Sequence, residues 1–163
     1  MKKLLLMRHA KSDWSDHSLS DFDRPLNERG TRAAPFMGAL LREQALVPDL
    51  IVASPATRAR ETAELVESAM GLSDPISFEH HIYEASPQTL LNIVLSVGDR
   101  FMTCMIVGHN PGMESLVRAL TGEIIPMPTA AIAVIESHAE SWKEFAHNDV
   151  KLVRVFRPKE LMS

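Results

Sequence analysis

The stretch Leu4-Leu5-Leu6-Met7-Arg8-His9 decides the fold, and Met105-Ile106-Val107-Gly108-His109 repeats its plan. Each stretch is a short apolar run that ends in a histidine. A third run, Leu50-Ile51-Val52-Ala53, leads through Ser-Pro to Arg58. Short apolar runs of this kind are typical of buried strands in a parallel sheet. Open α/β sheets bind ligands beyond the carboxyl ends of their strands. We therefore expect two imidazoles and two guanidinium groups to converge at one edge of the sheet.

Strand-like and helix-like segments alternate along the chain, which favours crossover units in an α/β fold with a mainly parallel sheet. A helix is expected after Gly30, and Pro35 fits that helix best within its first turn. Ser86-Pro87 is a typical helix start, with serine as the N-cap. The other expected strands and helices lie near residues 49–53, 56–70, 76–78, 104–107, 112–120, 131–135 and 150–156.

Length and composition indicate a globular protein in which residues 1–163 form a single domain. A hydrophobic fraction of 45% and a charged fraction of 23% are ordinary for this class. The net charge of -4 argues against a general nucleic-acid binder. The single cysteine, Cys104, excludes an internal disulfide and fits a cytoplasmic location. The apolar run after Lys2-Lys3 is too short for a signal peptide, and no segment predicts a membrane span.

Arginine and histidine at one sheet edge predict phosphoryl chemistry. Arginine suits planar, bidentate capture of a phosphate, and a neutral imidazole can attack phosphorus. Gly108 and Gly112 flank His109, and the helix after Gly112 offers free N–H groups to an anion. Arg60 lies two positions from Arg58 and points to another face, so we expect it to be solvated or ion-paired.

Four motifs, in the same order along the chain, resemble those of the histidine phosphatase superfamily, which has a phosphoglycerate mutase-like, three-layer α/β/α fold. The chain is most similar to the short, SixA-like phosphohistidine phosphatase branch. One position departs from the family's Arg-His-Gly motif, since Ala10 stands where the family has glycine. Alanine fits there if its φ is negative, so we do not expect inactivation. The motifs are Leu6-Met7-Arg8-His9-Ala10; Arg24-Pro25-Leu26 with Arg29-Gly30; Ser54-Pro55-Ala56-Thr57-Arg58-Ala59 with Thr62; and Val107-Gly108-His109-Asn110-Pro111-Gly112.

The resemblance implies a metal-independent phosphohydrolase without a cofactor. His9 would be the nucleophile and would form a phosphohistidine intermediate, which water then hydrolyses. Arg8, Arg58 and His109 would surround the equatorial oxygens and stabilise their charge. The implied substrate, and sole implied partner, is phosphohistidine on a protein or a small phosphorylated molecule.

Two further residues each have two interpretations. Arg24 either extends the substrate pocket or holds its loop through an ion pair with Asp21 or Asp23. Glu84, after Tyr83, either protonates the leaving oxygen, as an acidic residue does in the wider superfamily, or forms an ion pair with a pocket arginine. Such a proton donor matters for the hydrolysis of an alkyl phosphate. It matters hardly at all for a phosphorylated imidazole, because imidazole is a good leaving group.

Two other functions compete with the phosphatase. The first is a phosphoglycerate mutase-like isomerase, although the short chain offers little material for a lid that excludes water. The second is a non-catalytic phosphate-binding module. Residues 126–129 form either a wall of the pocket or a simple connection. The remaining histidines lack metal-ligand spacing and are expected at the surface: His17, His80, His81, His138 and His147.

Overall fold

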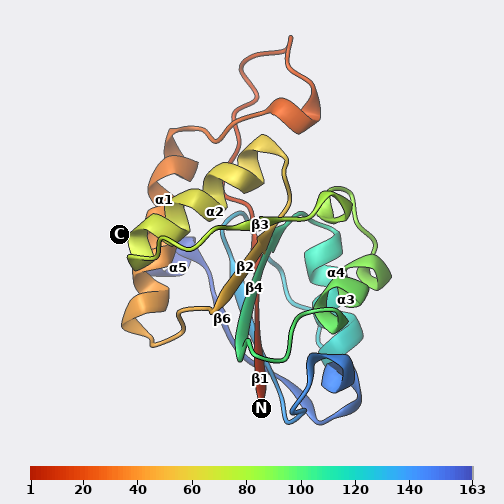
Figure 1. Cartoon of the computed structure of the whole chain (residues 1–163). Helices are drawn as coiled ribbons and strands as arrows, with labels where there is room; N and C mark the ends of the chain where they lie inside the picture. The colour runs from red at the N-terminus through yellow and green to blue at the C-terminus, as the bar shows by residue number, and fades with distance from the viewer. Residues whose placement is uncertain (163) are drawn as a thin grey trace.

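The computed structural model describes residues 1–162 and contains a six-stranded sheet between two layers of helices (Figure 1). The strand order is β3-β2-β4-β1-β5-β6. The first four of these pair in parallel, whereas β5 runs antiparallel to both β1 and β6. The expected mainly parallel sheet is confirmed. The strands are β1 (Lys2–Arg8), β2 (Leu50–Ala53), β3 (Ser77–Phe78), β4 (Thr103–Gly108), β5 (Ile132–Ser137) and β6 (Val150–Phe156).

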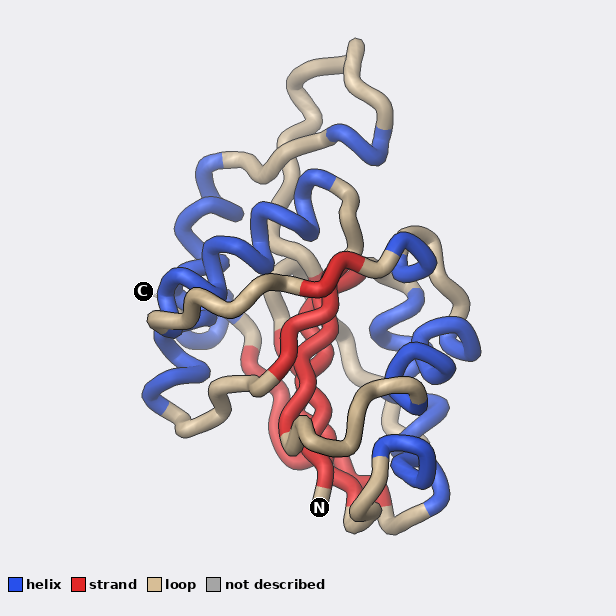
Figure 2. The backbone as a smooth tube through the Cα atoms, viewed as in Figure 1, coloured by secondary structure: helices blue, strands red, loops and turns tan. Residues whose placement is uncertain are grey.

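The helices cover both faces of the sheet (Figure 2). Helices α1 and α2 pack together on one face, and α3 and α4 lie on the other with the 3₁₀ turn η3. This arrangement is the expected three-layer α/β/α sandwich. The helices are α1 (Glu28–Glu43), α2 (Thr57–Met70), α3 (Pro87–Leu95), α4 (Gly112–Thr121) and α5 (Pro158–Leu161); the 3₁₀ turns are η1 (Asp21–Asp23), η2 (His80–Ile82) and η3 (Trp142–His147).

The apolar run of β1 supplies both halves of the core. Successive side chains of a strand point to opposite faces of the sheet. Leu5 and Met7 pack with the buried residues of α1 and α2, whereas Leu4 and Leu6 pack with those of α3, α4 and η3. All four side chains are fully buried. The run is therefore uninterrupted because helices cover both of its faces.

Helix α1 begins earlier than the sequence predicts. The side chain of Asn27 accepts a hydrogen bond from Gly30 N at 2.9 Å and caps the helix, which starts at Glu28. Pro35 consequently lies inside the helix, so its expected place in the first turn was wrong. Proline lacks an N–H and removes a helix hydrogen bond. Close packing of α1 on α2, where Gly38 fits directly against the backbone of Val66, compensates for that loss.

The other boundaries agree with expectation to within a few residues. The Ser86 hydroxyl accepts from Thr89 N at 3.2 Å and Pro87 opens α3, as predicted. That helix ends at Leu95, before the expected stop at Gly98. No helix within residues 1–162 combines the length and apolar character needed to cross a bilayer.

Candidate active site

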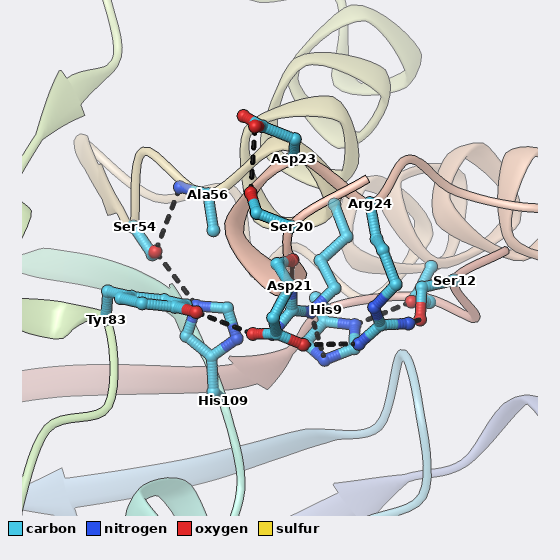
Figure 3. Close-up of polar contacts among 12 residues, drawn as sticks. His9, Ser12, Ser20, Asp21, Asp23, Arg24, Ser54, Ala56, Tyr83 and His109 are labelled. Atoms are coloured by element: carbon cyan, nitrogen blue, oxygen red, sulfur yellow. Dashed lines mark hydrogen bonds and ion pairs between the residues drawn. The ribbon is translucent and has the colours of Figure 1, made fainter. Parts of the chain in front are cut away.

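The two motif histidines lie side by side at the carboxyl edge of the sheet. Strands β1 and β4 pair with Arg8 opposite Gly108, so His9 and His109 leave the sheet at the same level. Their ring centroids are 5.2 Å apart, and the side chains are nearly buried, at 6% and 8% exposure (Figure 3). The convergence of the two imidazoles follows from the parallel register alone.

The ring of His9 is held by a hydrogen bond at each of its nitrogens. Its Nδ1 lies 2.7 Å from the carbonyl oxygen of Ala10, which can only accept, so Nδ1 carries the proton. The other nitrogen, Nε2, carries no proton and accepts a hydrogen bond from Nε of Arg58 at 3.3 Å. Burial, together with the neighbouring His109 and Arg58, lowers the pKa of His9 to about 3. His9 is therefore neutral at neutral pH and can act as a nucleophile through Nε2.

His109 presents a hydrogen-bond donor. Its Nε2 lies 2.8 Å from Oγ of Ser54, and that oxygen already accepts from Ala56 N at 3.2 Å. The serine hydroxyl can donate to Nε2, and in that tautomer the proton of His109 is on Nδ1. Nδ1 is buried and has no partner within the described residues. Burial and the charge of Arg58 lower the pKa of His109 to about 4. A bound oxyanion would satisfy this donor.

Arg58, near the start of α2, is buried and already contacts an anion. It donates to the backbone oxygen of Asp21 at 2.6 Å and to its carboxylate at 3.1 Å. The same carboxylate accepts from the Tyr83 hydroxyl at 2.6 Å (Figure 3). The hydrogen bond from Tyr83, with help from Arg24 and Arg58, lowers the pKa of Asp21. Burial and Asp21 raise the pKa of Tyr83 to about 12. Asp21 thus stays ionised beside the arginines.

Arg24 holds its loop. Its guanidinium donates to Asp21 at 2.9 Å and to Oγ of Ser12 at 2.7 Å, and it is 7% exposed. The ion pair is thus with Asp21, while Asp23 accepts from Ser20 at 2.8 Å. A contact of Arg24 with substrate stays a prediction.

Arg8 connects the site to the segment before β5. Its Nη1 donates to the carbonyl of Met127 at 3.1 Å, and its Nε is buried without a partner among residues 1–162. Nδ2 of Asn110 donates a hydrogen bond to the carbonyl oxygen of Met127 at 2.9 Å, and the backbone N–H of Met127 donates to the carboxylate of Glu114 at 2.9 Å. Residues 126–129 therefore lie beside the site, in line with the first of their two interpretations.

Ala10 does not have the positive φ that would require the glycine found at this position in the family. It is fully buried and is not among the residues with positive φ. Its N–H donates to Oγ1 of Thr62 at 3.0 Å, and Thr62 in turn donates to the carbonyl of Arg58 at 2.7 Å. The motif threonine thereby joins the loop after His9 to α2.

Glu84 does not form the alternative ion pair. It is exposed, has a φ of 56°, and makes no ion pair with an arginine in the described part of the chain. Its role as proton donor stays a prediction. Sequence reasoning missed its neighbour Tyr83, the only tyrosine of the chain, whose ring lies 5.5 Å from that of His109. It also assigned no role to Ser54, a motif residue that directly follows β2.

The predictions about Arg60 and the remaining histidines are confirmed. Arg60 forms a surface ion pair with Glu64 at 2.9 Å. No set of three His, Cys, Asp or Glu side chains within residues 1–162 is placed to hold a metal ion, and metal independence itself stays a prediction. The other histidines are exposed, as expected: His17, His80, His81, His138 and His147.

A neutral, buried imidazole among arginines at the carboxyl edge of a parallel sheet defines a phosphoryl-handling α/β protein. A model of the histidine phosphatase superfamily (branch 1) matches residues 4–88, more than half of the chain, and the chain belongs to this family. A chloroplastic protein of Arabidopsis thaliana is 33% identical over 153 residues, which cover 88% of this chain and 70% of that protein.

Solved structures agree with this assignment. The structure assigned as the phosphohistidine phosphatase SixA of Agrobacterium tumefaciens has a TM-score of 0.83 and 29% identity, over 96% of this chain and 98% of that one. The protein histidine phosphatase SixA complexed with tungstate has a TM-score of 0.85 at 20% identity, and the match covers 98% of this chain and 99% of that one. The SixA-like resemblance is thus confirmed, and with it a phosphatase or mutase-like enzyme class.

Proposed function

We propose that the protein is a metal-independent phosphohydrolase with His9 as its nucleophile. The observation that carries the proposal is the 2.7 Å contact between Nδ1 of His9 and the carbonyl of Ala10. It directs the lone pair of Nε2 toward Arg58, where a phosphoryl group would bind. We also propose that the protein lies in a reducing, cytoplasmic compartment, in line with its single, buried cysteine.

In the first step, the hydrogen bond from Nε of Arg58 to Nε2 of His9 gives way, and Nε2 attacks phosphorus. The bond to the leaving group breaks with its electron pair, and a substrate phosphohistidine that is protonated on its other ring nitrogen leaves as a neutral imidazole. The imidazole of His9 then carries a positive charge, which the carbonyl of Ala10 stabilises through Nδ1–H. The unpartnered Nε of Arg8 and Nδ1 of His109 donate to the equatorial oxygens, as does Arg58.

In the second step, water attacks the phosphohistidine in line and the N–P bond breaks. The electron pair of that bond returns to Nε2 of His9, and inorganic phosphate leaves. Burial restores the neutral imidazole, because it keeps the pKa of His9 at about 3. The nucleophile is thereby ready for another turnover without an added base.

Protein phosphohistidine is the substrate class that these features favour. A phosphorylated imidazole needs little help from a general acid, and the candidate acid Glu84 is exposed. The 29% identity with the SixA structure points in the same direction. Small phosphorylated molecules form the second class, and for these we propose Glu84 as the proton donor.

The test is phosphate release in EDTA from a phosphohistidine peptide and an aryl phosphate, with wild type, His9→Ala and the surface control His147→Ala. We expect turnover that survives chelation, prefers the peptide and is lost only in His9→Ala. Turnover unchanged by His9→Ala would exclude the mechanism. Binding of phosphate without turnover of any phosphorylated substrate would indicate a binding module, and phosphoryl exchange without phosphate release would indicate a mutase.

A further inference from the structure

A cavity of about 760 Å³ beside the site is lined by basic side chains. Five of its ten lining residues are lysine or arginine, and none is acidic. We call this cavity the basic groove. Its basic residues are Arg8, Lys11, Arg29, Arg32 and Lys159, and the others are Ala33, Pro128, Thr129, Pro158 and Met162.

The outer charges of the basic groove are exposed and unpaired. Within residues 1–162, Lys11, Arg29, Arg32 and Lys159 form no ion pair. By contrast, Arg24 and Arg58 in the site are both paired with Asp21. The chain as a whole carries a net charge of -4. A cluster of unpaired cations on an acidic protein concentrates positive potential at one place and attracts anions to it.

The basic groove is continuous with the site through Arg8, which lines both. Its position follows from close backbone packing at Gly30, where a Cβ would overlap the carbonyl oxygen of Lys11. That contact brings Lys11, two residues after the nucleophile, against the first turns of α1. Helix α5 lies beside α1 and completes the groove (Figure 1).

We propose that the basic groove binds acidic residues that flank the phosphohistidine of a protein substrate. This rests on the proposed function. The volume is that of a site for a ligand much larger than one phosphate. Exposed, flexible lysines and arginines spread along a groove suit several carboxylates on a protein surface, whereas a second phosphate of a small molecule favours a buried, bidentate clamp.

The kinetic test compares phosphohistidine peptides with acidic and with neutral flanking residues. The groove variant Arg29→Gln/Arg32→Gln is matched by Arg118→Gln/Lys151→Gln, which removes two exposed charges outside the groove. We expect the acidic-to-neutral ratio of kcat/KM to fall about three- to tenfold in the groove variant, chiefly through KM, and to stay unchanged in the control. An equal effect of both variants, or no acidic preference in wild type, overturns the proposal.

A binding test does not depend on catalysis. A fluorescent acidic peptide without phosphohistidine is titrated with wild type and both variants, and anisotropy is read at low and high salt. We expect wild type to bind it about tenfold more tightly than a neutral peptide, with a strong salt dependence that the groove variant reduces. Equal affinity for both peptides overturns the groove proposal. Acidic-peptide binding without phosphohistidine turnover overturns the proposed function alone.

Discussion

A single backbone contact fixes which nitrogen of His9, the proposed nucleophile, carries the proton. Because the carbonyl of Ala10 accepts from Nδ1, His9 exposes the nitrogen that can form an N–P bond. We predict that ¹⁵N NMR finds His9 protonated on Nδ1 and neutral down to about pH 5, since burial lowers its pKa to about 3. His109 should behave likewise, with its pKa at about 4. A proton on Nε2 of His9, or titration near that of free histidine, would contradict this.

Asp21 is an internal anion that pairs with Arg58, where we propose that phosphate binds. Its carboxylate lies 3.1 Å from Nη2 of that arginine and would repel a bound oxyanion. We predict that Asp21→Asn binds vanadate about three- to tenfold more tightly, because a like charge leaves the site. Isothermal titration calorimetry measures this. Asp23→Asn serves as the control, since its carboxylate contacts only Ser20 among the residues of the close-up (Figure 3). Weaker binding by Asp21→Asn would assign the carboxylate a positioning role instead.

At the scale of elements, local signals predicted most boundaries. The apolar runs gave β1 and β4, and Ser86-Pro87 gave the start of α3. The position of Pro35 within its helix was predicted wrongly from the same local signals. Helix α1 packs closely on α2, and no local sequence pattern reveals such a contact. The link between Tyr83 and Asp21 likewise joins residues 62 positions apart, so it becomes visible only in the folded chain.

The N-terminal turn of α1 depends on a glycine for close packing. We predict that Gly30→Ala destabilises the protein by about 1–3 kcal/mol, although alanine favours helices, because its Cβ would overlap the carbonyl of Lys11. Urea unfolding measures the difference. Gly98→Ala is the matched control, since a Cβ there meets only the Phe101 ring, at 3.7 Å. Equal free energies of unfolding for the two variants would contradict this prediction, because they would mean that α1 moves away from Lys11 without a loss of stability.

At the scale of the whole molecule, parallel topology explains why the principal site residues were predictable. Arg8 ends β1, His9 and His109 directly follow the paired strands β1 and β4, and Arg58 comes after the neighbouring strand β2. Their meeting at one edge needs no knowledge of side-chain contacts. The basic groove was not predictable, because α1, α5 and the segment before β5 come together only through tertiary packing.

Two buried neutral imidazoles also make the stability of the fold depend on pH. The unfolded chain binds protons on His9 and His109 below about pH 6.5, whereas the folded chain binds them only near pH 3 and 4. The unfolded state therefore binds more protons within this window, and stability falls as the pH decreases through it. Asp21, whose pKa is lowered on folding, loses its contribution in the same direction.

We accordingly predict that the free energy of unfolding falls by about 1.6 kcal/mol for each of the two imidazoles between pH 6.5 and 5. Urea unfolding at each pH measures this loss. His9→Gln and His109→Gln should each flatten the curve, because glutamine does not titrate, whereas the exposed His147→Gln should leave the difference from wild type constant. A slope unchanged in both site variants would mean that the two rings have the same pKa in the folded and the unfolded chain, and would contradict the lowered pKa values. The stability curve therefore tests whether burial keeps the two imidazoles neutral, which the proposed attack by His9 requires.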